Sequence, residues 1–149
     1  MHETILVTTD LSSGVDNAVE YAIDSAAASD ATLHVLYVVD AEAYSSYPGD
    51  EYVHEFEGLE HALEQAGREA VESIAERAAD AGVETETVLR RGVPHEEILA
   101  YTDEADVDLT VVGSKARSGE YRRLLGSVAQ RVTSMAERPV TIVKTPVQD

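Results

Sequence analysis

Residues 32–39 read TLHVLYVV, a run in which only Thr32 and His34 interrupt the apolar and aromatic side chains. A strand with one face in water alternates apolar and polar residues, whereas a strand covered on both faces is almost continuously apolar. Coverage on both faces is typical of central strands in parallel sheets, which carry helices on either side. The run therefore predicts a central strand of an α/β fold, with His34 as a hydrogen-bonded core residue.

The segments on either side of this run alternate between short apolar strands and amphipathic helices. The expected strands are residues 4–9, 32–39, 83–89, 107–113 and 138–144, and the expected helices are residues 15–27, 59–78, 94–105 and 127–137. Strands that alternate with helices imply right-handed crossovers and a parallel sheet. We therefore expect an α/β fold with helices on both faces of the sheet. One domain over residues 1–149 is expected, since a chain of this length buries roughly 70% of its unfolded surface.

Local signals mark where these elements begin and end. Ser12 or Ser13 can cap the first helix, and Gly82 is expected to end the long second helix. Residues 40–52 are rich in the Pro, Gly, Ser and Tyr residues that are typical of an irregular segment. The apolar residues expected to face inward from the last helix are Val128, Val132, Met135 and Ala136.

The composition is that of an acidic globular protein. The chain holds 29 acidic and 11 basic residues, has a net charge of −18, and is 44% hydrophobic. A surface of this charge repels phosphates, so we expect no nucleic-acid partner. Only two basic residues are lysines, which favours the hypothesis of adaptation to concentrated cytoplasmic salt. The absence of cysteine excludes disulfides and thiol chemistry.

No stretch has the pattern of a targeting or membrane-spanning segment. The apolar runs fall short of the ~20 residues that a spanning helix needs. The first ten residues, MHETILVTTD, lack the basic and long apolar regions of a signal peptide. We therefore expect a cytoplasmic protein with no membrane partner.

The basic residues gather in the last quarter of the chain, because residues 113–149 hold 7 of the 11. Gly113 follows a predicted strand, and Gly126 and Ser127 open a predicted helix. In this arrangement, backbone N–H groups and a helix N-terminus can hold phosphate oxygens. The alternative is that Gly113 only makes a turn and Ser127 only caps a helix. The basic side chains expected around a polyphosphate are Lys115, Arg117, Arg122 and Arg123.

The common nucleotide motifs are absent, since the chain has neither a GxxxxGK[ST] loop nor a GxGxxG fingerprint. It also lacks a GxSxG nucleophile elbow. Gly113, Ala116 and Gly126-Ser127 instead fill the slots of a pattern that runs G, two residues, G, nine residues, G-[ST]. With ILVTTDLSSG, LYVVD, GVPHEEI and RPVTIVK in the same order, the chain resembles the universal stress protein family over nearly its whole length.

This resemblance implies a Rossmann-like, doubly wound sheet of five parallel strands in the order 3-2-1-4-5, and a homodimer formed through the last strand. That strand contains VTIV and would otherwise be left as an unpaired edge. The resemblance also implies ATP, with Mg²⁺, as the ligand. The nucleotide-binding positions that it carries over are Thr9, Asp10, Val38, Val112, Gly113, Ser114, Ala116, Gly126, Ser127 and Val128.

One position departs from the family pattern, because the second motif glycine is Ala116. A methyl group there costs about 1 kcal/mol if φ must be positive, or crowds a ligand oxygen. With ordinary dihedrals, Ala116 would still offer its N–H. The favoured function is a nucleotide-binding stress-response switch or tolerance factor with at most slow ATP hydrolysis and an unknown protein partner. The alternatives are a dimeric interaction protein that has lost nucleotide binding, and an enzyme of adenylyl transfer.

Two further sets of residues have alternative interpretations. His54, Glu57 and His61 share a helical spacing that metal ligands can use, but a solvated surface is the simpler interpretation. Asp10 could be the phosphoacceptor of a receiver domain, yet no acidic pair adjoins it and Lys144 lies at the end of the chain. A helix-cap role for Asp10 is the simpler alternative. We assign no catalytic residue and no metal ligand from the sequence.

Overall fold

The fold was analysed in a computed structural model, which describes residues 3–11, 16–40, 53–115 and 127–145. The strands are β1 Thr4–Thr9, β2 Thr32–Asp40, β3 Thr85–Gly92, β4 Leu109–Lys115 and β5 Val140–Thr145. The helices are α1 Asp16–Ser29, α3 Val53–Asp80, α4 Pro94–Glu104 and α5 Ser127–Met135. Every strand and helix expected from the sequence is therefore present, with boundaries that shift by a few residues.

The five strands form one parallel sheet in the order β3-β2-β1-β4-β5, which confirms the order implied by the family resemblance. β1 lies in the middle, where Leu6 stands opposite His34 of β2 and Thr110 of β4. The chain winds outward from β1 in both directions, so the strand order reverses between β1 and β4. In open α/β sheets, ligands bind beyond the carboxyl ends of the strands at such a reversal.

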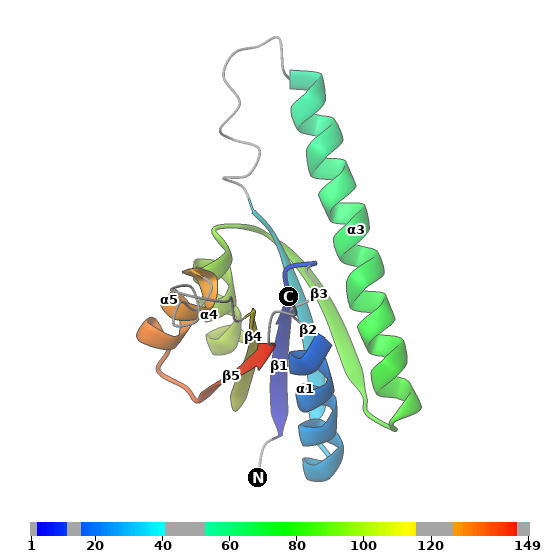
Figure 1. The fold of residues 1–149 in the computed structure, drawn as a ribbon, viewed down its shortest axis with the longest axis vertical. Helices are drawn as coiled ribbons and strands as arrows, with labels where there is room; N and C mark the ends of the chain where they lie inside the picture. Colours follow the sequence, from blue (N-terminus) through cyan, green and yellow to red (C-terminus); the bar gives the residue numbers. More distant parts are fainter. Residues whose placement is uncertain (1–2, 12–15, 41–52, 116–126, 146–149) are drawn as a thin grey trace.

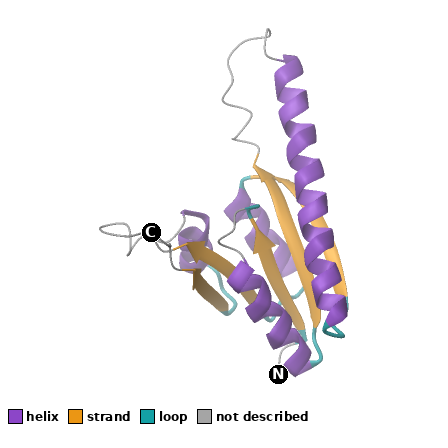
Figure 2. Ribbon diagram, turned by 45° about the vertical axis from the view of Figure 1, so that its right-hand side comes forward, coloured by secondary structure: helices purple, strands orange, loops and turns teal. Residues whose placement is uncertain are grey.

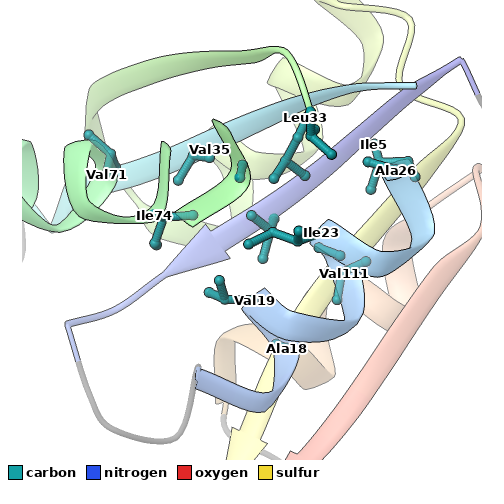
Figure 3. Packing of buried hydrophobic residues seen from close by; sticks show 14 of the residues in the cluster. Ile5, Ala18, Val19, Ile23, Ala26, Leu33, Val35, Val71, Ile74 and Val111 are labelled. Atoms are coloured by element: carbon teal, nitrogen blue, oxygen red, sulfur yellow. The ribbon is translucent and has the colours of Figure 1, made fainter. Parts of the chain in front are cut away.

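Helices cover both faces of the sheet, with α1 and α3 on one side and α4 and α5 on the other (Figure 1). On the first face, Val35 of β2 is fully buried and belongs to one apolar cluster with Ile23 of α1 and Val71 of α3 (Figure 3). On the second face, the buried residues of β1 and β2 pack against Ile98 and Val132. Residues 33–39 of β2 are all buried, which confirms the strand predicted from its apolar run.

The long helix α3 runs along the sheet and extends past the ends of the strands (Figure 2). It ends as predicted at a glycine, because Gly82 has a φ of +77°, a conformation that costs a glycine little. The N–H of Val83 donates to the carbonyl of Ala78 at 2.9 Å, and the N–H of Gly82 donates to the carbonyl of Ala79 at 2.9 Å. This pair of bonds is a Schellman motif, which satisfies the last carbonyls of the helix.

One predicted core position is wrong, since Met135 is 58% exposed. The buried face of α5 is centred between Ala129 and Val132, which are 5% and 0% exposed. At about 100° per residue, Met135 lies some 60° from Val132 on the side away from Ala129. Its position at the last residue of α5 also leaves it without a following turn to cover it.

Some sequence predictions fall outside the described residues. These are the caps at Ser12 and Ser13 and nearly all of the irregular segment at 40–52. None of the helices in the described parts of the chain is long and apolar enough to span a membrane.

Candidate functional site

A cavity of about 250 Å³ lies at the carboxyl ends of β1, β2 and β4, at the reversal of strand order. Its walls come from these three strands, from the first two turns of α4 and from the first turn of α5. The residues that line it are Thr8, Thr9, Asp10, Leu36, Tyr37, Val38, Asp40, Pro94, Ile98, Val112, Gly113, Val128 and Ala129. The fold thus brings together side chains from five elements that are far apart in the sequence.

Six of the ten nucleotide-binding positions expected from the sequence line this cavity. They are Thr9, Asp10, Val38, Val112, Gly113 and Val128. Two others lie beside it along the chain, since Ser114 follows Gly113 in β4 and the exposed Ser127 is the first residue of α5. The remaining two, Ala116 and Gly126, lie outside the described residues.

The basic side chains expected around a polyphosphate also belong to residues whose side chains the structure does not describe. Arg117, Arg122 and Arg123 fall between β4 and α5 in the part not described, and only the backbone of Lys115 is described. The three residues whose helical spacing metal ligands can use are also only partly described, because His61 is exposed while the side chains of His54 and Glu57 are not described. Among the described residues, no group of three or more His, Asp or Glu side chains is placed to hold a metal ion.

The end of β1 is held in a strained turn beside the cavity. Thr9 is 7% exposed, and its Oγ1 accepts a hydrogen bond from the N–H of Leu11 at 3.2 Å. Leu11 has a φ of +70°, a left-handed conformation that costs a residue with a Cβ about 1–2 kcal/mol. Strain of this kind persists only where the surrounding structure imposes it, and it gathers at functional sites. Between these two residues, Asp10 lines the cavity.

The end of β2 adds two polar residues that the sequence analysis did not assign to the site, Tyr37 and Asp40. Tyr37 is 5% exposed, and burial raises the pKa of its hydroxyl, with a further rise from the negative charges of Asp10 and Asp40. The phenol therefore stays neutral at physiological pH. A signal was available, because β2 and β1 are parallel neighbours and their carboxyl ends must meet at the same edge of the sheet.

Helix α4 supplies Pro94 and Ile98 to the cavity, and these also were not expected there. The sequence pattern indicates that Ile98 is buried and that Pro94 suits a first helical turn. Pro94 indeed opens α4, and Ile98 is 3% exposed. Only the packing of α4 on the sheet shows that the same face reaches the cavity.

The chemistry of the cavity differs between its walls. Leu36, Val38 and Val112 give it apolar sides that can take a flat ring. The carboxylates of Asp10 and Asp40 accept hydrogen bonds from hydroxyl or amino groups. The first turn of α5, which supplies Val128 and Ala129 to the lining, has N–H groups that have no partner within the helix and carry partial positive charge. The arrangement suits a ligand with an apolar ring, polar hydroxyls and an anionic end.

Comparison with known proteins agrees with this architecture. A model of the universal stress protein family matches residues 1–144. A universal stress protein of Methanocaldococcus jannaschii is 34% identical over 146 residues, covering 98% of this chain and 84% of the relative. Among solved structures, the universal stress protein UspA from Lactobacillus plantarum has a TM-score of 0.82 at 25% identity, with 95% of this chain and 97% of that chain covered. A universal stress protein in complex with cAMP has a TM-score of 0.65 at 27% identity, with 96% and 97% covered.

Proposed function

The chain belongs to the universal stress protein family, and from this premise we propose that it binds an adenine nucleotide, ATP with Mg²⁺, in the cavity at the carboxyl ends of β1, β2 and β4. The observation that carries the proposal is that six positions taken from the family pattern line one cavity beside the N-terminus of α5. The similar structure in complex with cAMP supports the same class of ligand.

Each part of the ligand has a counterpart in the cavity. Val38, Val112 and Ile98 offer an apolar slot for the adenine ring, and Asp10 offers acceptors for the ribose hydroxyls. The backbone of Gly113 and the first turn of α5 would hold the phosphates. Carboxylate oxygens are the ligands that Mg²⁺ prefers, so Asp40, which also lines the cavity, would be a ligand for the ion that accompanies ATP.

In this proposal, the chain is a single domain over residues 1–149 and works in the cytoplasm as a stress-response switch or tolerance factor, with at most slow hydrolysis of ATP. It forms a homodimer through β5. Within the described residues β5 pairs only with β4, and its Ile142 and Val143 are half-buried, so its free edge is suited to a second copy. Light scattering at micromolar concentration is expected to give twice the mass of the chain, and a monomer would contradict the dimer.

Isothermal titration with Mg-ATP in molar KCl tests the nucleotide site. The protein is expected to bind, and Gly126→Asp is expected to abolish binding because it adds a negative charge where the family pattern places a phosphate. Gly58→Ala is the matched control, since a methyl group at Gly58 meets nothing within 4 Å and the residue does not line the cavity. If the native protein and Gly126→Asp bound Mg-ATP with equal affinity, the ligand would bind at a site other than this cavity.

Ala116 favours a second candidate function, that of a dimeric interaction protein whose nucleotide site has lapsed. The two functions differ in the outcome of Ala116→Gly. Loss of the methyl group would strengthen existing binding by about fivefold if it relieves about 1 kcal/mol of strain. If the native protein does not bind ATP and Ala116→Gly does, the interaction protein is the correct assignment.

A further inference from the structure

His34 is a buried histidine that bridges β2 to two neighbouring elements. It is 8% exposed, its Nδ1 lies 2.5 Å from the hydroxyl of Tyr101, and its Nε2 lies 3.0 Å from Oε2 of Glu86. An ionised carboxylate can only accept hydrogen bonds, so Nε2 must carry the proton and donate to Glu86. Nδ1 is then the acceptor for the hydroxyl of Tyr101. A neutral imidazole therefore satisfies both neighbours at once.

Tyr101 connects this histidine to the wall of the cavity. It lies on α4, three residues after Ile98, so the two side chains share one face of the helix. Both are buried, at 7% and 3% exposed, and both pack in the apolar cluster on this side of the sheet. Ile98 also lines the cavity, as does Pro94 at the start of α4. The hydrogen bond to His34 thus fixes the same helix face that forms a cavity wall.

Arg90 makes a second connection between the sheet and α4. Its guanidinium lies 5.1 Å from the centre of the Tyr101 ring, and it pairs with Glu97 at 3.9 Å and with Glu104. Glu104 is exposed, and such pairs contribute little because water screens them. The buried hydrogen bond between His34 and Tyr101 is weakened less by the surrounding water than the ion pair of Arg90 with Glu104.

We propose that the hydrogen bond from Tyr101 to neutral His34 positions α4 at the cavity, so that protonation of His34 loosens the wall formed by Ile98 and weakens ligand binding there. The binding part of this inference rests on the proposed function. The change in the cavity wall does not rest on the proposed function, because protonation of His34 would alter the wall whether or not a ligand binds. His34 and Tyr101 are positioning residues, since neither lines the cavity.

Protonation removes the acceptor that the Tyr101 hydroxyl uses. With a proton on both nitrogens, the ring becomes a double donor, and the hydroxyl must turn and find a new acceptor in a buried site. Burial lowers the pKa of His34 below 6.5, while the negative charge of Glu86 opposes that change. The titratable and charged groups around the ring are Glu84, Glu86 and Arg90 of β3 and its entry, and Tyr101 and Glu104 of α4.

The first experiment follows the ring of His34 and the methyl groups of Ile98 by NMR through a pH titration of the protein without ligand. We expect the Ile98 methyl signals to shift with the same midpoint as the His34 ring. In His34→Gln, whose side chain keeps one donor and one acceptor but does not titrate, that shift should be absent. The inference would be overturned if the Ile98 methyl signals did not shift with the same midpoint as the His34 ring, or if they shifted equally in His34→Gln.

The second experiment compares Mg-ATP affinity at about pH 7.5 with the affinity at a pH below the midpoint that the NMR titration gives for the His34 ring, so that the histidine is neutral in one measurement and protonated in the other. The loss of affinity on acidification should be at least about fivefold greater in the native protein than in His34→Gln, a size typical of coupling between sites. Tyr101→Phe should bind less tightly at the higher pH and show no extra loss at the lower one. The native protein and His34→Gln have the same cavity residues and are measured with the same ligand. Any titration of the ligand or of the cavity residues therefore cancels in the comparison.

The two experiments separate the inference from the proposed function. If Mg-ATP fails to bind at either pH, the proposed function fails, and the Ile98 signals alone decide whether His34 controls the wall. If Mg-ATP binds and the pH dependence is equal in the native protein and His34→Gln, the site stands and the inference is wrong.

Discussion

Gly67 of α3 lies so close to Tyr37 of β2 that a Cβ at Gly67 would lie 2.2 Å from Cδ2 of the ring. Real Cβ atoms essentially never approach another heavy atom this closely. The absence of a side chain at Gly67 therefore lets α3 settle on the sheet above Tyr37. Because Tyr37 also lines the cavity, this contact links the packing of the longest helix to the candidate site.

Gly67→Ala should destabilise the protein even though alanine is the better helix former. The methyl group must displace a ring that is 5% exposed, and overpacking of this kind costs about 1–3 kcal/mol. Gly58→Ala in the same helix should instead raise the free energy of unfolding by up to about 1 kcal/mol, because a Cβ there meets open space. Urea unfolding of the two variants measures both effects, and a stabilised Gly67→Ala would contradict the contact.

Asp108 holds the start of β1 against the start of β4. Its Oδ2 accepts hydrogen bonds from the backbone N–H groups of Glu3 at 2.8 Å and Thr4 at 2.9 Å. Asp108→Ala leaves both donors without this acceptor and should lower the free energy of unfolding by about 1–3 kcal/mol. Asp108→Asn keeps an acceptor oxygen, so its free energy of unfolding should fall less. Equal losses of stability in the two variants would show that Asp108 does not act by accepting these hydrogen bonds.

The stability of the fold should fall on mild acidification because of His34. Burial keeps the pKa of His34 below the value of 6.5 expected in the unfolded chain, so the unfolded state takes up the proton first as the pH falls. The stabilising effect of neutral His34 is complete above pH 6.5. It is lost as the pH falls from 6.5 toward the lower pKa that His34 has in the folded protein. Unfolding of the native protein and His34→Gln at several pH values measures the difference. Parallel curves through that range would contradict this assignment.

Salt should stabilise the protein. Its net charge of −18 makes the folded state repel itself, and the range of that repulsion falls from about 10 Å at 0.1 M salt to about 3 Å at 1 M. We expect the melting temperature to rise between low salt and molar KCl. Sucrose at matched osmolarity controls for a general solute effect, and a melting temperature unchanged by KCl would rule out salt adaptation.

The sequence was most informative where burial imposes a repeating pattern. The continuous apolar run of β2 and the stripe on α3 identify their elements without any knowledge of neighbours, as does the glycine that ends α3. The pattern failed at Met135, because a stripe on a short helix fixes the buried direction only to within part of a turn. The site could be inferred in part, since the resemblance named six of its lining positions.

The order and type of the elements can be inferred from the sequence alone, because hydrophobic periodicity and turn residues act over a few neighbouring positions. The packing of the folded chain brings Tyr37, Asp40, Pro94 and Ile98 to Asp10 at one cavity. The same packing brings His34 to Tyr101, which is 67 positions away along the chain. Such contacts depend on strand register and on the packing of α4 against the sheet, and these are properties of the folded chain as a whole.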